Sequence, residues 1–190
     1  AFPSVGATEN VLLAASLGKG RTILNNAARE PEIKNLADFL TLCGAKIYFA
    51  GEGKIIIDGV KKLHGCEFRV ISDRIVAATY MAAAAVTGGE IDILNFPVND
   101  VTPVLPQFEA CGCKIASDEN RMHIKAPSRL KSMGTVRTMP YPGFPTDFPA
   151  PAMTMASVAE GTAIFIETIF ESRYKHVSEL KKMGANITTQ

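Results

Sequence analysis

An internal repeat runs through this chain of 190 residues. The same four-residue mark, a glycine followed by a small residue, a polar residue and an isoleucine, stands at residues 44–47, 112–115 and 184–187. Apolar residues lie four positions and one position before each glycine, which is the spacing of the buried side of a helix. Each mark therefore predicts a helix that ends at the glycine and a strand that starts just after it.

A second glycine precedes each mark by 23 or 24 residues, at Gly20, Gly89 and Gly161. Each of these closes a small-residue stretch that predicts a helix, most clearly at 75–86 and 151–158, and precedes a run with strand character. The predicted strands after these glycines are 21–24, 90–94 and 162–166, and further strands are predicted at 54–57 and 122–125. The alternation predicts an α/β (α+β) fold with helices on the sheets, in two complete units and most of a third.

Composition restricts the class of protein. With 47% hydrophobic and 21% charged residues, the chain is too apolar for a disordered protein and long enough for a core. The formal net charge is +1 and no Lys/Arg run occurs, so nothing favours nucleic acid or an anionic membrane as a partner. The apolar run at 11–15 is too short to cross a bilayer, and residues 1–4 do not resemble a signal peptide. We expect a soluble, cytoplasmic protein without membrane insertion.

The cysteines and histidines show no metal-site pattern. The four cysteines lack the paired spacing of zinc ligands and the density of a disulfide framework, and the three histidines are far apart. We expect reduced, mostly buried cysteines and no bound metal. These residues are Cys43, Cys66, Cys111, Cys113, His64, His123 and His176.

Five segments resemble those of the UDP-N-acetylglucosamine enolpyruvyl transferases. Residues 4–10 read SVGATEN and residues 141–147 read YPGFPTD, and both are similar to segments of that family. Residues 26–33, 73–75 and 171–176 are also similar, in the same order and at similar spacing. On this resemblance, which extends over nearly the whole chain, the sequence is identified as an internal fragment of a family member.

The resemblance implies two globular domains, each built from three βαβαββ units arranged as an inside-out barrel, with the active site in the cleft between them. Residues 1–71 then correspond to the last repeat unit of one domain, and residues 72–190 to the first one and a half or so units of the second. Both domains are expected to be incomplete, and the missing portions of the chain are expected partners of the fragment.

The resemblance also implies a reaction. The family moves the enolpyruvyl group of phosphoenolpyruvate to the 3-hydroxyl of UDP-N-acetylglucosamine and releases phosphate through a tetrahedral intermediate, in the first committed step of peptidoglycan synthesis. No metal or organic cofactor is implied. The family's general-acid cysteine sits on a loop that none of the four cysteines here matches, so we expect the fragment alone to be inactive.

Asp147 is the first candidate for the chemistry. Transfer to a sugar hydroxyl needs a group that accepts or orients its proton, and a carboxylate within hydrogen-bond reach can do so. The resemblance gives that role to the aspartate of the FPTD segment, which is Asp147. The alternative is that Thr146 or Asp147 caps the following helix, and both roles are compatible.

The segment before and at the first predicted helix is the expected binding site for UDP-N-acetylglucosamine. Ser4, Val5 and Gly6 open this helix, where free N–H groups and the helix dipole favour an anion such as the UDP diphosphate. The alternative is an ordinary serine N-cap. Phe2 and Pro3 match positions on the nucleotide-binding edge of the family.

Two further candidates lie near the end of the chain. Ile169 matches a family position that contacts the nucleotide sugar, although an apolar residue there is equally a core residue. Arg173 matches a family arginine at the phosphate end of the cleft, and its guanidinium fork suits phosphate or carboxylate. The alternative for Arg173 is a surface ion pair with Glu171 or Glu179.

Other charged residues have open roles. One residue of a charged loop is expected to line the cleft, and two residues at the domain junction either pair across it or cap a helix. These are Arg29, Glu30 and Glu32 in the loop, and Asp73 and Arg74 at the junction. The helix ends near Ser4, Asp73 and Asp147 are expected to face one cleft, which their dipoles make positive.

Two alternative functions remain. The sister enolpyruvyl transferases, which act on a shikimate phosphate, share the repeat unit, but the SVGATEN and FPTD segments favour the nucleotide sugar. The chain can also be a non-catalytic repeat scaffold that binds a nucleotide sugar or a protein partner. An assay of phosphate release from phosphoenolpyruvate and UDP-N-acetylglucosamine separates the scaffold from an enzyme. Turnover of shikimate phosphate, together with the absence of the cysteine loop from the full gene, would favour the sister family.

Overall fold

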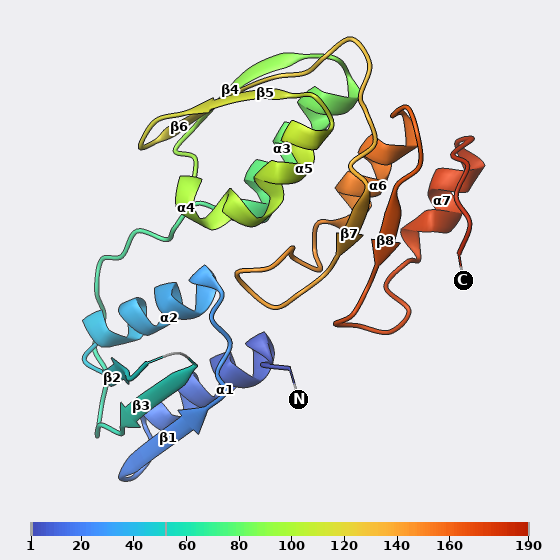
Figure 1. Cartoon of the computed structure of the whole chain (residues 1–190). Coiled ribbons are helices and arrows are strands. Elements are labelled where there is room, and N and C mark those ends of the chain that lie inside the picture. Colours follow the sequence, from blue (N-terminus) through green and yellow to red (C-terminus); the bar gives the residue numbers. More distant parts are fainter. Residues whose placement is uncertain (1, 52, 190) are drawn as a thin grey trace. The chain divides into compact units, whose positions relative to one another are not determined.

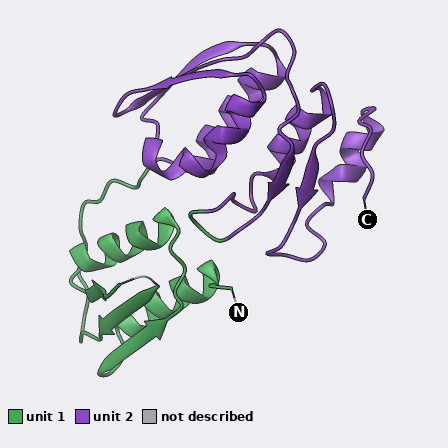
Figure 2. Cartoon of the chain, viewed as in Figure 1, with its two compact units in different colours: residues 1–71, 140–142 green, residues 72–139, 143–190 purple. Residues whose placement is uncertain are grey.

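The computed structural model describes residues 2–51 and 53–189. The chain divides into two compact units, of which unit 1 contains residues 1–71 with 140–142 and unit 2 contains residues 72–139 with 143–190 (Figure 2). Each unit combines helices with small sheets (Figure 1). The mixed α/β fold predicted from the repeat is confirmed.

In unit 1, helices pack against one face of an antiparallel sheet with the strand order β1-β3-β2 (Figure 1). Side chains alternate between the two faces of this sheet. Ile55 and Ile57 of β3 are buried under the helices, whereas Ile23 of β1 and Tyr48 of β2 are half-exposed on the other face. The elements are α1 (Val5–Ser16), β1 (Arg21–Asn25), α2 (Pro31–Leu42), β2 (Lys46–Phe49) and β3 (Lys54–Asp58).

The first part of unit 2 repeats this topology. Its antiparallel sheet has the order β4-β6-β5, so the strand that comes last in the sequence, β6, again lies between the other two. Helix α3 packs under this sheet through buried alanines and Met81, because small side chains let the helix approach closely. The elements are α3 (Arg74–Val86), β4 (Glu90–Leu94), α4 (Val98–Val101), η1 (Thr102–Val104), α5 (Leu105–Ala110), β5 (Lys114–Ser117) and β6 (Arg121–Lys125).

The second part of unit 2 contains β7 (Thr135–Arg137), α6 (Pro149–Ser157), β8 (Ile164–Ile166) and α7 (His176–Lys182). Strands β7 and β8 pair in parallel. Strand β8 is shorter than the predicted 162–166, and β7 was not predicted. Helix α6 begins two residues before the predicted 151–158, because Pro149 suits the first turn of a helix.

The three repeat marks end their helices in the same way. Ala45 N donates to Leu40 O at 2.9 Å, and the matching bonds after α5 and α7 have the same five-residue span. The intervening glycines have φ of +100°, +89° and +96°, which favours glycine because it lacks a Cβ. The predicted helix ends are confirmed. The strand predicted after Gly184 is wrong, since residues 185–189 pair with no strand in the described part of the chain.

Candidate functional site

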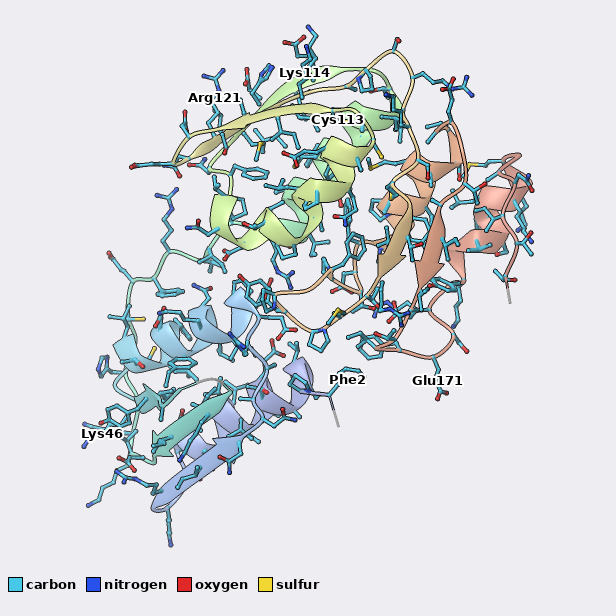
Figure 3. The ribbon with its side chains drawn as sticks, in the orientation of Figure 1. Phe2, Lys46, Cys113, Lys114, Arg121 and Glu171 are labelled. Carbon is cyan, nitrogen blue, oxygen red and sulfur yellow. The ribbon has the colours of Figure 1, made fainter. Side chains whose placement is uncertain are left out.

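The two candidate catalytic residues, Asp147 and Arg173, form an ion pair in unit 2. Arg173 Nη2 donates to Asp147 Oδ1, and the guanidinium lies over the ring of Phe170, 5.0 Å from its centroid. The Asp147 and Arg173 side chains are 53% and 35% exposed, so a ligand can reach both. Of the alternative partners for Arg173, Glu179 pairs with Lys182, and Glu171 points away from the loop that carries it (Figure 3).

Buried aromatic residues hold the segment that carries Asp147. Phe148 is fully buried, and its ring centroid lies 5.9 Å from that of Phe108 and 5.8 Å from that of Phe144. Phe148 is also the N-cap residue of α6, which has no side-chain cap hydrogen bond. The alternative that Thr146 or Asp147 caps this helix is therefore wrong, because their side chains bond elsewhere.

Glu167 connects the loops around this pair. Its Oε1 accepts hydrogen bonds from Thr138 Oγ1 at 2.8 Å, Ile169 N at 2.7 Å and Phe170 N at 3.2 Å, and its Oε2 accepts one from Thr146 Oγ1 at 3.0 Å. Burial by itself raises the pKa of Glu167, but these hydrogen bonds outweigh it, and the pKa lies below its ordinary value. The ionised carboxylate thus holds three separate stretches of chain together.

As a consequence, two candidate residues 22 positions apart belong to one local structure. Asp147 follows Thr146 directly, and Ile169 donates its backbone N–H to the same carboxylate that Thr146 reaches. The Ile169 side chain is partly buried. The structure brings Asp147, Ile169 and Arg173 into this one region of unit 2.

The other candidate residues lie at the start of α1 in unit 1. Ser4 is the N-cap, and its Oγ accepts a hydrogen bond from Ala7 N at 3.3 Å. The next two amides, of Val5 and Gly6, have no preceding helical turn to which they can donate. Gly6 and Phe2 are exposed, and Figure 3 shows Phe2 at this end of the helix. Ser4 is thus a helix cap, beside the exposed Gly6.

The sequence comparisons show the family of the chain. The family model for EPSP synthase (3-phosphoshikimate 1-carboxyvinyltransferase) matches residues 1–190. The chain belongs to this family. The UDP-N-acetylglucosamine 1-carboxyvinyltransferase 1 of Caldanaerobacter subterraneus subsp. tengcongensis is 51% identical over 186 residues, which are 98% of this chain and 45% of that protein. The UDP-N-acetylglucosamine 1-carboxyvinyltransferase of Finegoldia magna is 46% identical over 192 residues, with coverage of 100% and 45%.

These names confirm the family that the sequence segments indicated. The chain spans about 45% of the length of the curated relatives it matches. Among solved structures, the enolpyruvyl transferase NikO from Streptomyces tendae aligns with a TM-score of 0.86 at 21% identity, covering 97% of this chain and 44% of that chain. This likeness confirms the enolpyruvyl transferase fold for this EPSP synthase family member.

In this family member, the charged loop of unit 1 lies beside a groove of about 320 Å³. Arg29 and Glu30 line this groove within unit 1, whereas Glu32 is not among its lining residues, and the role of the loop in the predicted cleft stays a prediction. Glu30 Oε2 is buried and has no hydrogen-bond partner in the part of the chain that the structure describes. The helix α2 begins directly after this residue.

At the junction between the units, Asp73 caps α3. Its Oδ1 accepts hydrogen bonds from Ile75 N at 2.8 Å and Val76 N at 2.9 Å, so the predicted capping role is confirmed for Asp73. Arg74 is buried and lines a small recess of unit 2 together with Asp100 and Pro145.

Within residues 2–51 and 53–189, no group of three or more His, Cys, Asp or Glu side chains is arranged to hold a metal ion. Over the same residues, every helix is too short or too polar to cross a membrane.

Sequence reasoning missed Glu167, although the repeat marks its position. Asn26, Asn95 and Glu167 each follow the repeat glycine of their unit by six residues. The two asparagines take the left-handed backbone conformation, with φ of 57° and 55°, in the turn after their strands. A carboxylate in that place departs from the repeat, and this departure was the signal for a special role.

Proposed function

We propose that this chain is part of a UDP-N-acetylglucosamine 1-carboxyvinyltransferase, a cytoplasmic enzyme of peptidoglycan synthesis. This enzyme transfers the enolpyruvyl group of phosphoenolpyruvate to the 3-hydroxyl of UDP-N-acetylglucosamine and releases phosphate. The observation that carries the proposal is the contact between Asp147 and Arg173, which are 26 residues apart, in a chain 45–51% identical to proteins of that name.

In the proposed reaction, Asp147 accepts or orients the proton of the 3-hydroxyl while the hydroxyl oxygen attacks C2 of phosphoenolpyruvate. Its half-exposed carboxylate allows such a hydroxyl to approach. Arg173 binds the phosphate or carboxylate of phosphoenolpyruvate, because a guanidinium has five donors and the bond to Asp147 uses one of them.

The nucleotide sugar is proposed to contact two groups of candidate residues. The N–H groups at Ser4, Val5 and Gly6 bind the diphosphate, since a helix N-terminus favours an anion. Phe2 and Pro3 contact the nucleotide, and Ile169 contacts the sugar.

The domain assignment is part of the same proposal. Residues 1–71 form the last repeat unit of one barrel domain, and residues 72–190 form the first one and a half or so units of the other. The 190 residues alone are expected to release no phosphate, because the family's general-acid cysteine lies outside them.

The experiment measures phosphate release by the full-length enzyme that contains this chain, with phosphoenolpyruvate and UDP-N-acetylglucosamine. Asp147→Asn keeps the size of the side chain but removes the proton acceptor. We expect kcat to fall by roughly 100-fold to 1,000-fold, because a positioned acid or base contributes on that order, while KM changes less.

Glu179→Gln is the matched control, because it removes the same charge from an exposed residue of α7 that pairs with Lys182. This control is expected to keep wild-type turnover. Wild-type kcat in Asp147→Asn would remove Asp147 from the chemistry, and a full-length protein that releases no phosphate from these substrates would refute the function itself.

A further inference from the structure

Two thiols outside the proposed site lie close together in unit 1. Cys43 Sγ and Cys66 Sγ are 3.5 Å apart, and both cysteines are free. Cys43 is the C-cap residue of α2 and is buried, whereas Cys66 is partly exposed. A disulfide bond requires a sulfur separation of about 2.0 Å, so the two sulfur atoms must come about 1.5 Å closer together to form one.

Contacts of the residues before and after Cys66 hold it in this place. Cys66 belongs to residues 59–73, which connect the units and contain neither helix nor strand. Before it, His64 N donates to Cys43 O at 2.9 Å. After it, the ring of Phe68 packs edge-on against Phe39 of α2, with 5.5 Å between centroids. The two thiols are therefore preorganised, and their reaction has a high effective concentration.

We propose that Cys43 and Cys66 are a redox-sensitive pair whose disulfide fastens the connecting segment to the end of α2. The oxidant is a low-molecular-weight disulfide such as oxidised glutathione. The Cys66 thiolate attacks one sulfur of this disulfide and releases one glutathione thiolate. The Cys43 thiolate then attacks the Cys66 sulfur of the mixed disulfide and releases the second, and each cysteine gives up one proton.

The exposure of the two thiols decides which of them reacts first, and their protonation decides the rate of the reaction. Cys66 is the accessible partner, so the mixed disulfide forms there. Burial raises the pKa of the Cys66 thiol, and the contact with Cys43 raises it further. The reaction is therefore slow at neutral pH, and its rate rises as the thiolate fraction grows at higher pH.

The test uses the 190-residue chain and does not depend on the proposed function. The reduced chain is incubated with oxidised glutathione, alkylated, and analysed by intact mass and peptide mapping. We expect the loss of two hydrogen atoms and a link between Cys43 and Cys66. The unfolding midpoint of unit 1 should rise by about 5 °C or more, since closing such a loop constrains the unfolded chain. Between pH 7 and pH 8 the oxidation rate should rise about tenfold.

Single variants separate the two steps. Cys43→Ser should stop at a stable glutathione adduct on Cys66, and Cys66→Ser should react much more slowly because Cys43 is buried. The matched control replaces Cys111 and Cys113, which are buried in unit 2, and should oxidise as the wild type does. Burial raises the pKa of Cys111 to about 11, which keeps it protonated. Figure 3 marks Cys113 beside α5.

Separate glutathione adducts on Cys43 and Cys66 in the wild-type chain would overturn the proposal. A disulfide that forms in denaturant but not in the folded chain would also overturn it, because the folded backbone would then not supply the preorganisation.

Discussion

The carboxylates of unit 2 differ in role because their surroundings differ. Asp147 is half-exposed and forms an ion pair with Arg173, which suits a group that exchanges partners with a ligand. Glu167 is partly buried and accepts four hydrogen bonds, which suits a group that holds neighbouring loops in place. We infer that Glu167 positions the segment of Asp147 rather than contacting a substrate.

Glu167 should make the stability of unit 2 depend on acid pH. Because the pKa of Glu167 is lower in the folded chain than its ordinary value, its contribution is complete above that ordinary value, about 4.5, and is lost as the pH falls through the lowered pKa. Urea unfolding of Glu167→Gln should therefore show a weaker loss of stability between about pH 5 and pH 3 than the wild type shows.

Glu167→Ala is the contrasting variant. The amide oxygen of glutamine can still accept from Ile169 N, and Thr146 Oγ1 can turn to accept from the amide nitrogen, whereas alanine leaves these donors without their acceptor. We expect Glu167→Ala to lose about 2 kcal/mol at pH 7, and Glu167→Gln to lose less. Equal acid sensitivity of the wild type and Glu167→Gln would contradict this role.

The sequence identified Asp147, Ile169 and Arg173 as candidates, but not their contacts. The candidates came from the family resemblance, in which Asp147 belongs to the FPTD segment and Arg173 to the ESR segment, whereas Ile169 matches a family position outside both segments. The ion pair and the hydrogen bonds of Glu167 with Thr138 and Thr146 join residues 21 to 29 positions apart. Such contacts depend on how α6 and β8 pack, and no local pattern records this.

At the scale of elements, the glycine after each helix was the most reliable signal. It predicted three helix ends because the left-handed backbone there is a local requirement. Strands were less predictable, since a strand exists through its partner. Strand β7 is only Thr135–Arg137 and is defined by its parallel pairing with β8, whereas the isoleucine after Gly184 has the strand pattern but no partner strand in residues 2–51 and 53–189.

Alanine at these glycines should have unequal effects. A Cβ at Gly184 meets no atom within 4 Å, so Gly184→Ala should cost about 1 kcal/mol for the left-handed backbone alone. A Cβ at Gly44 lies 3.1 Å from His64 Nε2, so Gly44→Ala should cost about 1 kcal/mol more. Urea unfolding monitored by hydrogen-exchange mass spectrometry reports the two units separately.

A second variant isolates the contact with the histidine. In a His64→Ala background, Gly44→Ala should cost about as much as Gly184→Ala, because the crowded ring is gone. If the cost of Gly44→Ala is the same in both backgrounds, the contact with His64 has no energetic weight.

At the scale of the whole molecule, the repeat in the sequence and the enolpyruvyl transferase fold indicate the same architecture. The spacing of the glycines predicted tandem helix and strand units, and the two sheets of the order β1-β3-β2 and β4-β6-β5 have the same topology. The roles of the candidate residues are harder to derive from the sequence, and these residues are divided between the units, with Ser4 in unit 1 and Asp147 in unit 2. A chain with about 45% of the length of its relatives supplies part of the catalytic groups that we propose for the enzyme.

The choice of acceptor substrate tests the central claim most directly. Full-length enzyme containing this chain is supplied with phosphoenolpyruvate and either UDP-N-acetylglucosamine or shikimate 3-phosphate, and kcat/KM for phosphate release is measured. We expect turnover with the nucleotide sugar and at least about 100-fold lower kcat/KM with the shikimate phosphate, because a site built to bind one acceptor leaves its polar groups unpaired with the other. Equal or greater turnover with shikimate 3-phosphate would contradict the account.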